Sequence, residues 1–89
     1  MGKPRLKFDC VLLREGNGYS ALCLNVSVAS QGETPAKTKR ALKDAVELYL
    51  DDARKNNRTY VRPVPESEDP RTRKPESIVS VYKIGVDNH

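Results

Sequence analysis

The stretch TPAKTKRALKDAVELYLDDARKNN, residues 34–57, decides the fold of this 89-residue chain. Small and apolar side chains recur in it at spacings of three and four residues, the period of an amphipathic helix; they are Ala41, Leu42, Ala45, Val46, Tyr49, Leu50 and Ala53. Thr34 can cap a free backbone N–H and Pro35 suits the first helical position. We therefore predict a helix of about 22 residues, roughly 33 Å long, that crosses most of a sheet.

The residues before this helix predict strands. Residues 6–14 and 19–24 are rich in strand-forming side chains, and the intervening turn contains Gly16, Asn17 and Gly18, which tolerate positive φ. This pattern predicts a β-hairpin. Val26 and Val28 alternate with Ser27, so we place a third strand at residues 25–29, either continuous with the second strand or after a bend near Asn25. We expect a break at residues 30–33.

The residues after the helix divide into a loop and a last strand. Four prolines and many charges in residues 58–76 predict a loop that is partly mobile. Residues 77–86 alternate again and predict a final strand, which could pair within the chain or with the edge of another chain.

The order β-β-β-α-β predicts one α+β domain over residues 1–89. We expect an antiparallel sheet of three to four strands with the long helix packed on one face. No apolar run approaches the roughly 18 residues that span a bilayer, and no apolar stretch of signal-peptide type follows the basic N-terminus. We therefore expect a cytoplasmic protein without membrane contact.

Cys10 and Cys23 would lie directly opposite each other if the hairpin closes symmetrically about Gly16 and Asn17. A cross-strand disulfide or two soft metal ligands are conceivable, but a structural zinc site needs four ligands. We favour two reduced thiols that pack as small hydrophobic groups.

No residue pattern predicts catalysis, a cofactor or a metal site. The single histidine, His89, ends the chain, and the acidic residues of the helix and of the proline-rich loop, including Asp69, are expected to be solvated. A phosphate-binding glycine loop and a nucleophile elbow are both missing from the sequence. We therefore predict a binding protein, not an enzyme.

The net charge of +4 is concentrated in clusters of basic residues on and after the helix. Such clusters could bind a protein partner or nucleic-acid phosphates, although the outer face of a helix is usually charged only for solubility. The candidate contacts are Lys39, Arg40, Lys43 and Arg54.

Three segments together resemble the HicB-like antitoxin family. They are YSALCL at residues 19–24, VASQGET at residues 28–34 and ALKDAVELYL at residues 41–50. The family pattern is a strand, a Gln-Gly-Asp/Glu-Thr junction and a helix ending in Glu-Leu-Tyr-Leu, and here it includes Gln31, Gly32, Thr34, Ala45 and Tyr49.

This resemblance implies an intracellular antitoxin that binds and neutralises a small HicA-like toxin, an mRNA-cleaving protein. It also implies a stand-alone domain of the N-terminal type, since the residues after the helix leave no room for the DNA-binding segment that many members carry. The alternative is a small basic RNA- or DNA-binding module that uses the helix face.

The final strand is apolar enough to seek a partner edge. We therefore predict a homo-oligomer, a dimer or larger, that uses Ile78, Val79, Val81, Tyr82 and Ile84.

Overall fold

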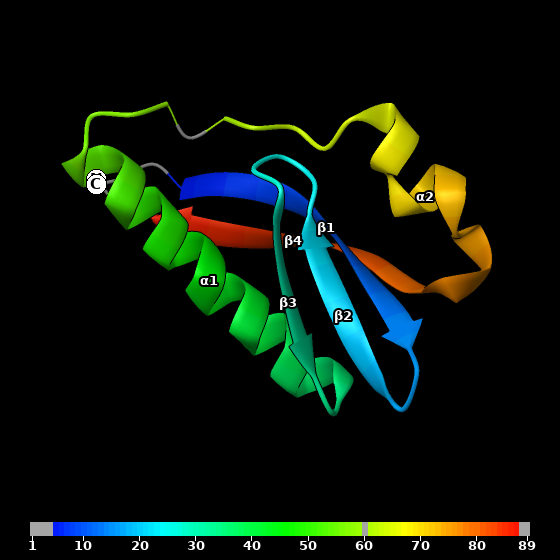
Figure 1. Cartoon of the computed structure of the whole chain (residues 1–89). Helices are drawn as coiled ribbons and strands as arrows, with labels where there is room; N and C mark the ends of the chain where they lie inside the picture. Colours follow the sequence, from blue (N-terminus) through cyan, green and yellow to red (C-terminus); the bar gives the residue numbers. More distant parts are fainter. Residues whose placement is uncertain (1–4, 60, 88–89) are drawn as a thin grey trace.

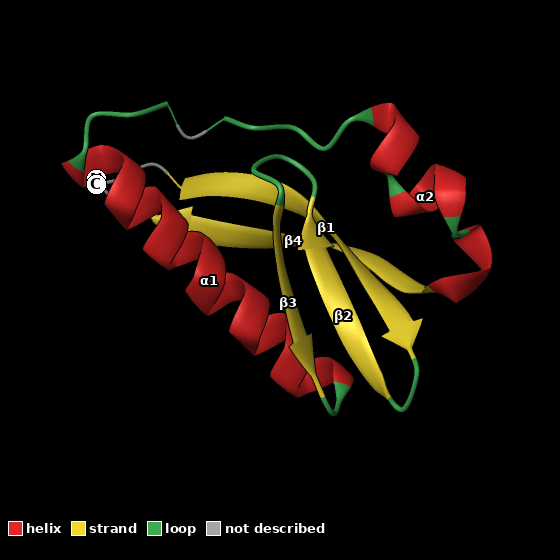
Figure 2. Cartoon of the chain, viewed as in Figure 1, coloured by secondary structure: helices red, strands yellow, loops and turns green. Residues whose placement is uncertain are grey.

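A single antiparallel sheet with the strand order β3-β2-β1-β4 organises the chain (Figure 1). The computed structural model describes residues 5–59 and 61–87. Its strands are β1 (Arg5–Glu15), β2 (Gly18–Cys23), β3 (Val28–Gly32) and β4 (Ile78–Asp87). The long helix α1 (Pro35–Lys55) lies on one face of the sheet, so the predicted α+β fold is confirmed (Figure 2).

The first hairpin has the predicted register. Gly16 adopts a φ of 60° in the two-residue turn, a conformation that glycine reaches without strain. The strands then pair Glu15 with Gly18 and Cys10 with Cys23. The two cysteines are therefore direct cross-strand neighbours, as the symmetry of the turn predicts.

The third strand lies three residues later than predicted. Residues 24–27 form a turn in which Ser27 has a φ of 55°, its N–H donates to the Cys23 carbonyl at 3.0 Å, and its hydroxyl donates to the Arg62 carbonyl at 2.5 Å. The chain re-enters the sheet only at Val28. Gln31 and Gly32, which we expected to break the strand, belong to β3 and pair with Ser20 and Tyr19.

Helix α1 begins as predicted. The Thr34 hydroxyl accepts the Lys37 N–H at 3.1 Å, a cap that contributes about 1 kcal/mol to stability. The buried side chains of the helix are Thr38, Leu42, Val46, Leu50 and Ala53. Thr38 was not predicted to be buried; its hydroxyl donates to the Thr34 carbonyl at 2.7 Å, so burial leaves no unpaired polar group.

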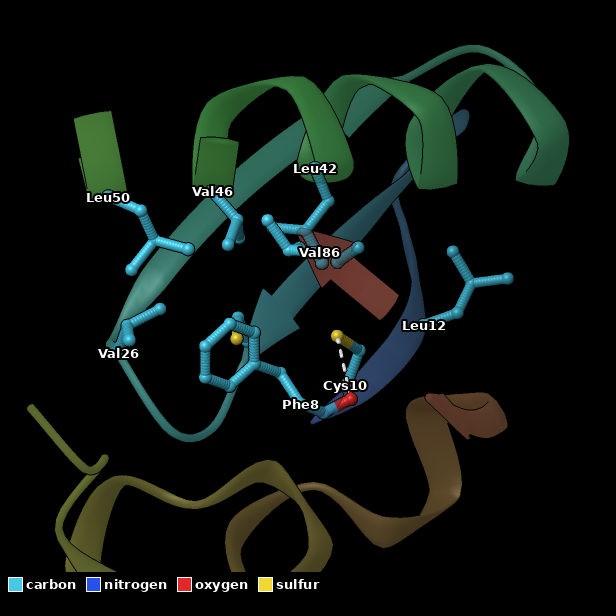
Figure 3. Packing of buried hydrophobic residues seen from close by; sticks show 10 residues of the cluster. Phe8, Cys10, Leu12, Val26, Leu42, Val46, Leu50 and Val86 are labelled. Atoms are coloured by element: carbon cyan, nitrogen blue, oxygen red, sulfur yellow. Dashed lines mark hydrogen bonds between the residues drawn. The ribbon is translucent and has the colours of Figure 1, made fainter. Parts of the chain in front are cut away.

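The main core lies between α1 and the sheet. Leu42, Val46 and Leu50 point from the helix toward the strands (Figure 3). They meet buried side chains from β1, β2, β4 and the turn before β3: Phe8, Cys10, Leu12, Ala21, Cys23, Val26 and Val86.

A second, smaller cluster occupies the opposite face of the sheet. Val11, Leu13 and Leu24 are buried there, and Val64 and Ile78 pack against them. The segment that follows α1 therefore covers part of this face, with backbone bonds from Arg62 and Val64 to the turn before β3.

The proline-rich segment contains short helical turns, where the sequence predicted only a loop. It contains the short helix α2 (Pro70–Arg73) between two single turns of 3-10 helix, Glu66–Glu68 and Pro75–Ser77. Our expectation that Asp69 is solvated was wrong: it is buried, caps α2 through the Arg71 N–H at 2.9 Å, and pairs with the Arg71 guanidinium. The hydrogen bond from Arg71 holds the pKa of Asp69 below its usual value.

Strand β4 pairs antiparallel with β1 of its own chain. The sequence had left open whether this strand pairs within the chain or with the edge of another chain. It is an outer strand, so one of its two edges has no neighbouring strand among the described residues. Among the described helices, none is long and apolar enough to cross a membrane.

Candidate interaction surface

An open groove separates α1 from the outer strand β4. Its first part, with a volume of about 570 Å³, is lined by Lys39, Arg40, Lys43, Asp44, Glu47, Tyr82, Lys83 and Ile84. Its second part, about 490 Å³, continues along the helix and is lined by Asp44, Glu47, Leu48, Leu50, Asp51, Arg54 and Val86. Asp44 and Glu47 line both parts, so we treat them as one surface, the α1–β4 groove.

The charges of the groove change sign along the helix. Lys39, Arg40 and Lys43 come first, and Asp44, Glu47 and Asp51 follow. Asp51 pairs with Arg54, whereas Arg40, Lys43, Asp44 and Glu47 form no ion pair with any described residue. These four groove charges are therefore exposed to solvent with no opposite charge in contact within the described part of the chain.

Tyr82 forms part of the floor of the groove. The Lys39 ammonium lies 4.6 Å from the centre of the Tyr82 ring, a cation–π contact that fixes one groove lysine. Tyr82 Oη and Ser80 Oγ are buried and have no hydrogen-bond partner among the described residues. Burial raises the pKa of Tyr82 above its ordinary value, so the hydroxyl stays protonated at neutral pH.

The other face of β4 is apolar and open. Val79 is 50% exposed and Val81 is 55% exposed. Val81 pairs with Val11 of the second cluster, so it lies on the side of the sheet away from α1. Exposed valines on a strand with no described neighbour at one edge are features that favour pairing with a strand of another protein.

The structure brings together residues that we predicted separately. Lys39, Arg40 and Lys43 share the groove with Tyr82 and Ile84, two residues of the predicted oligomer strand. Arg54 lies at the other end of the groove. The remaining strand residues divide, since Ile78 packs in the second cluster while Val79 and Val81 face solvent.

Sequence reasoning missed the acidic half of this surface. Asp44, Glu47 and the 70% exposed Leu48 fall off the apolar stripe of the helix, so they were interpreted only as its outer face. Asp44 and Glu47 follow Arg40 and Lys43 by one helical turn. This spacing could have shown that the acidic and basic residues lie on the same side of the helix.

The two cysteines are fully buried free thiols in the main core. Cys10 Sγ lies 3.9 Å from the Phe8 carbonyl, to which it donates a weak hydrogen bond (Figure 3). The adjacent Cys23 side chain and burial raise the pKa of Cys10 well above its ordinary value. The protonated Cys10 thiol is a weak nucleophile, and the complete burial of both side chains in an apolar core favours a packing role.

We expect both thiols to react with a disulfide reagent such as Ellman's reagent only when the chain unfolds. At about pH 8 the native protein should react many-fold more slowly than the same protein in concentrated guanidinium, because attack requires an exposed thiolate. Absorbance of the released thiolate, followed over time, measures both rates. Reaction of two equivalents at the unfolded rate under native conditions would contradict the burial of the pair.

No group of three or more His, Cys, Asp or Glu side chains within residues 5–59 and 61–87 could hold a metal ion. His89, which we considered as a general base, lies outside the described residues. Of the fold-motif residues, Gln31 and Gly32 lie at the end of β3, where they line a shallow pocket with Glu15, Gly18, Tyr19 and Glu33. Thr34 caps α1, and Ala45 and Tyr49 lie along it.

Comparison of the chain with protein-family models, with curated proteins and with solved structures gives no significant match in any of the three. The resemblance to the HicB-like family stays a prediction based on the residues quoted above.

Proposed function

We propose that this chain is a non-enzymatic, cytoplasmic protein-binding domain, and that its partner adds to the open edge of β4. The observation that carries the proposal is the ten-residue outer strand, which has two half-exposed valines, Val79 and Val81, and one edge without a neighbouring strand among the described residues. A partner strand would continue the sheet through backbone hydrogen bonds and cover these valines. The sequence resemblance supports a HicB-type antitoxin, for which the partner is a small HicA-like mRNA-cleaving toxin.

We expect the partner to be a small ribonuclease whose activity this chain suppresses. The tagged chain is used to recover partners from its native host, and the recovered protein is then tested for mRNA cleavage with and without added chain. Substitution of Val79→Lys together with Val81→Lys should weaken binding by at least about tenfold, since lysine opposes strand addition at an edge.

Val61→Lys is the matched control, because Val61 is 58% exposed and belongs to the segment after α1. It should bind like the unmodified chain. Recovery of no small ribonuclease, or of one whose cleavage is unaffected by the chain, would reject the antitoxin assignment. Equal binding by the β4 variant and the control would reject β4 as the contact.

Self-association is the second part of the proposal. The predicted oligomer strand is β4, and two of its residues, Tyr82 and Ile84, line a groove that the described residues leave open. We expect light scattering to give a mass of at least twice the 10.0 kDa of one chain.

A nucleic-acid-binding module is the alternative function, favoured by the adjacent Lys39, Arg40 and Lys43 along one wall of the groove. Asp44 and Glu47 in the same wall oppose it, since carboxylates repel phosphates. Salt-dependent binding to generic RNA that charge reversal at Arg40 and Lys43 abolishes would favour this alternative over protein binding.

A further inference from the structure

The α1–β4 groove has a polarity that any occupant must match. Its beginning is basic, with Lys39 stacked on Tyr82 and with Arg40 and Lys43 unpaired among the described residues. Its continuation is acidic, with Asp44 and Glu47 unpaired in the same part of the chain. A uniformly acidic ligand or a nucleic acid would therefore meet attraction at one end and repulsion at the other.

The helix and the strand define the direction of this polarity. Lys39 lies beside Tyr82, whereas Leu50 and Arg54 lie in the same part of the groove as Val86. The chain therefore runs in the same direction along β4 as along α1. A second groove placed in the opposite direction presents acidic residues to the basic half and basic residues to the acidic half.

A two-fold axis perpendicular to the groove produces this antiparallel placement. In a two-fold dimer, residue i of one copy contacts residue j of its partner, and j contacts i in return. The groove is therefore complementary in charge to a second copy of itself.

We propose that the α1–β4 groove binds a second copy of this chain around a two-fold axis, with Arg40 and Lys43 of each copy facing the partner's Asp44 and the partner's Glu47. This inference rests on the proposed self-association and names its surface. The groove lies on the helix side of β4, whereas Val81 faces the other side, so the two proposed contacts are on different faces of the strand.

Charge reversal in matched pairs tests the proposal on the full chain. Arg40→Glu with Lys43→Glu makes the groove acidic throughout, and Asp44→Lys with Glu47→Lys makes it basic throughout. Each double variant alone should dissociate at least about tenfold more readily than the unmodified dimer, because like charges then face each other. Sedimentation equilibrium measures the dissociation constants, and circular dichroism checks that α1 is retained.

Three further samples separate the specific surface from a general effect of charge. An equimolar mixture of the two double variants should form a heterodimer, and the quadruple variant should recover a homodimer, since its groove is again self-complementary with the order of signs inverted. The control Arg62→Glu with Lys74→Glu makes the same change in net charge as Arg40→Glu with Lys43→Glu, at exposed positions outside the groove, and should leave dimerisation unchanged.

The possible results are distinguishable. A monomeric unmodified chain at high micromolar concentration would overturn both self-association and this surface. A dimer that tolerates both reversals, or a mixture that stays monomeric, would overturn the surface alone. A monomer that binds generic RNA through Arg40 and Lys43 would assign the groove to nucleic acid instead. None of these results decides whether the β4 edge binds a ribonuclease, which the Val79 and Val81 variant tests separately.

Discussion

Replacement of Leu42 by alanine is expected to lower the free energy of unfolding by about 3 kcal/mol. Leu42 is fully buried at the centre of the main core, where it packs from α1 against the sheet (Figure 3). The substitution removes apolar contacts and leaves a cavity that a close-packed core fills only in part. Because a domain has a total stability of about 5–15 kcal/mol, this loss is a large fraction of it.

Denaturation by urea, followed by far-ultraviolet circular dichroism, measures the effect at one fixed protein concentration for all variants. Val61→Ala is the control, since Val61 is exposed outside the core; it should stay within about 0.5 kcal/mol of the unmodified chain. An unchanged midpoint for Leu42→Ala would mean that α1 does not form the core with the sheet.

The features that were predicted from the sequence depend on neighbours along the chain. The three- and four-residue spacing of apolar side chains predicted α1, and the Thr34 cap with Pro35 gave its start. The two-residue turn at Gly16 predicted the hairpin register and thereby the pairing of Cys10 with Cys23. These signals are local, because a helix period or a tight turn is decided within a few residues.

The features that were missed depend on residues far apart in the sequence. The start of β3 follows from the turn at Ser27, whose hydroxyl bonds to Arg62, 35 residues further along the chain. Asp69 and Pro70 are buried because the segment after α1 folds back over the second face of the sheet. Composition alone could only describe this segment as polar and rich in proline.

The candidate surface was predicted only in part, because it too combines residues that are far apart in the sequence. The basic residues of α1 and the apolar residues of β4 were each visible in the sequence, but nothing in the sequence placed Lys39 against Tyr82. Only the tertiary arrangement shows that the two sets form one groove, and that Asp44 and Glu47 complete it.

Replacement of Gly32 by alanine is expected to destabilise the fold by about 2–3 kcal/mol, through a steric conflict at the junction between β3 and α1. A Cβ atom on Gly32 would lie 2.6 Å from Thr38 Oγ1 and 2.9 Å from the Thr38 backbone nitrogen. The hydroxyl is held by its bond to the Thr34 carbonyl and the nitrogen belongs to the first turn of α1, so neither can move without moving the helix. This close approach gives a physical reason for glycine in the Gln31-Gly32-Glu33-Thr34 junction.

Gly16 provides the matched comparison because its requirement for glycine has a different cause. It has a φ of 60° and no atom within 4 Å of an added Cβ, so alanine there is strained only by its backbone conformation, by about 1 kcal/mol. Asparagine tolerates this conformation and should restore most of the loss at position 16. At position 32 asparagine should be at least as damaging as alanine, because it adds the same Cβ and more. Thermal unfolding of the four variants measures both effects, and equal recovery by asparagine at the two positions would show that backbone conformation, not the contact with Thr38, selects glycine at position 32.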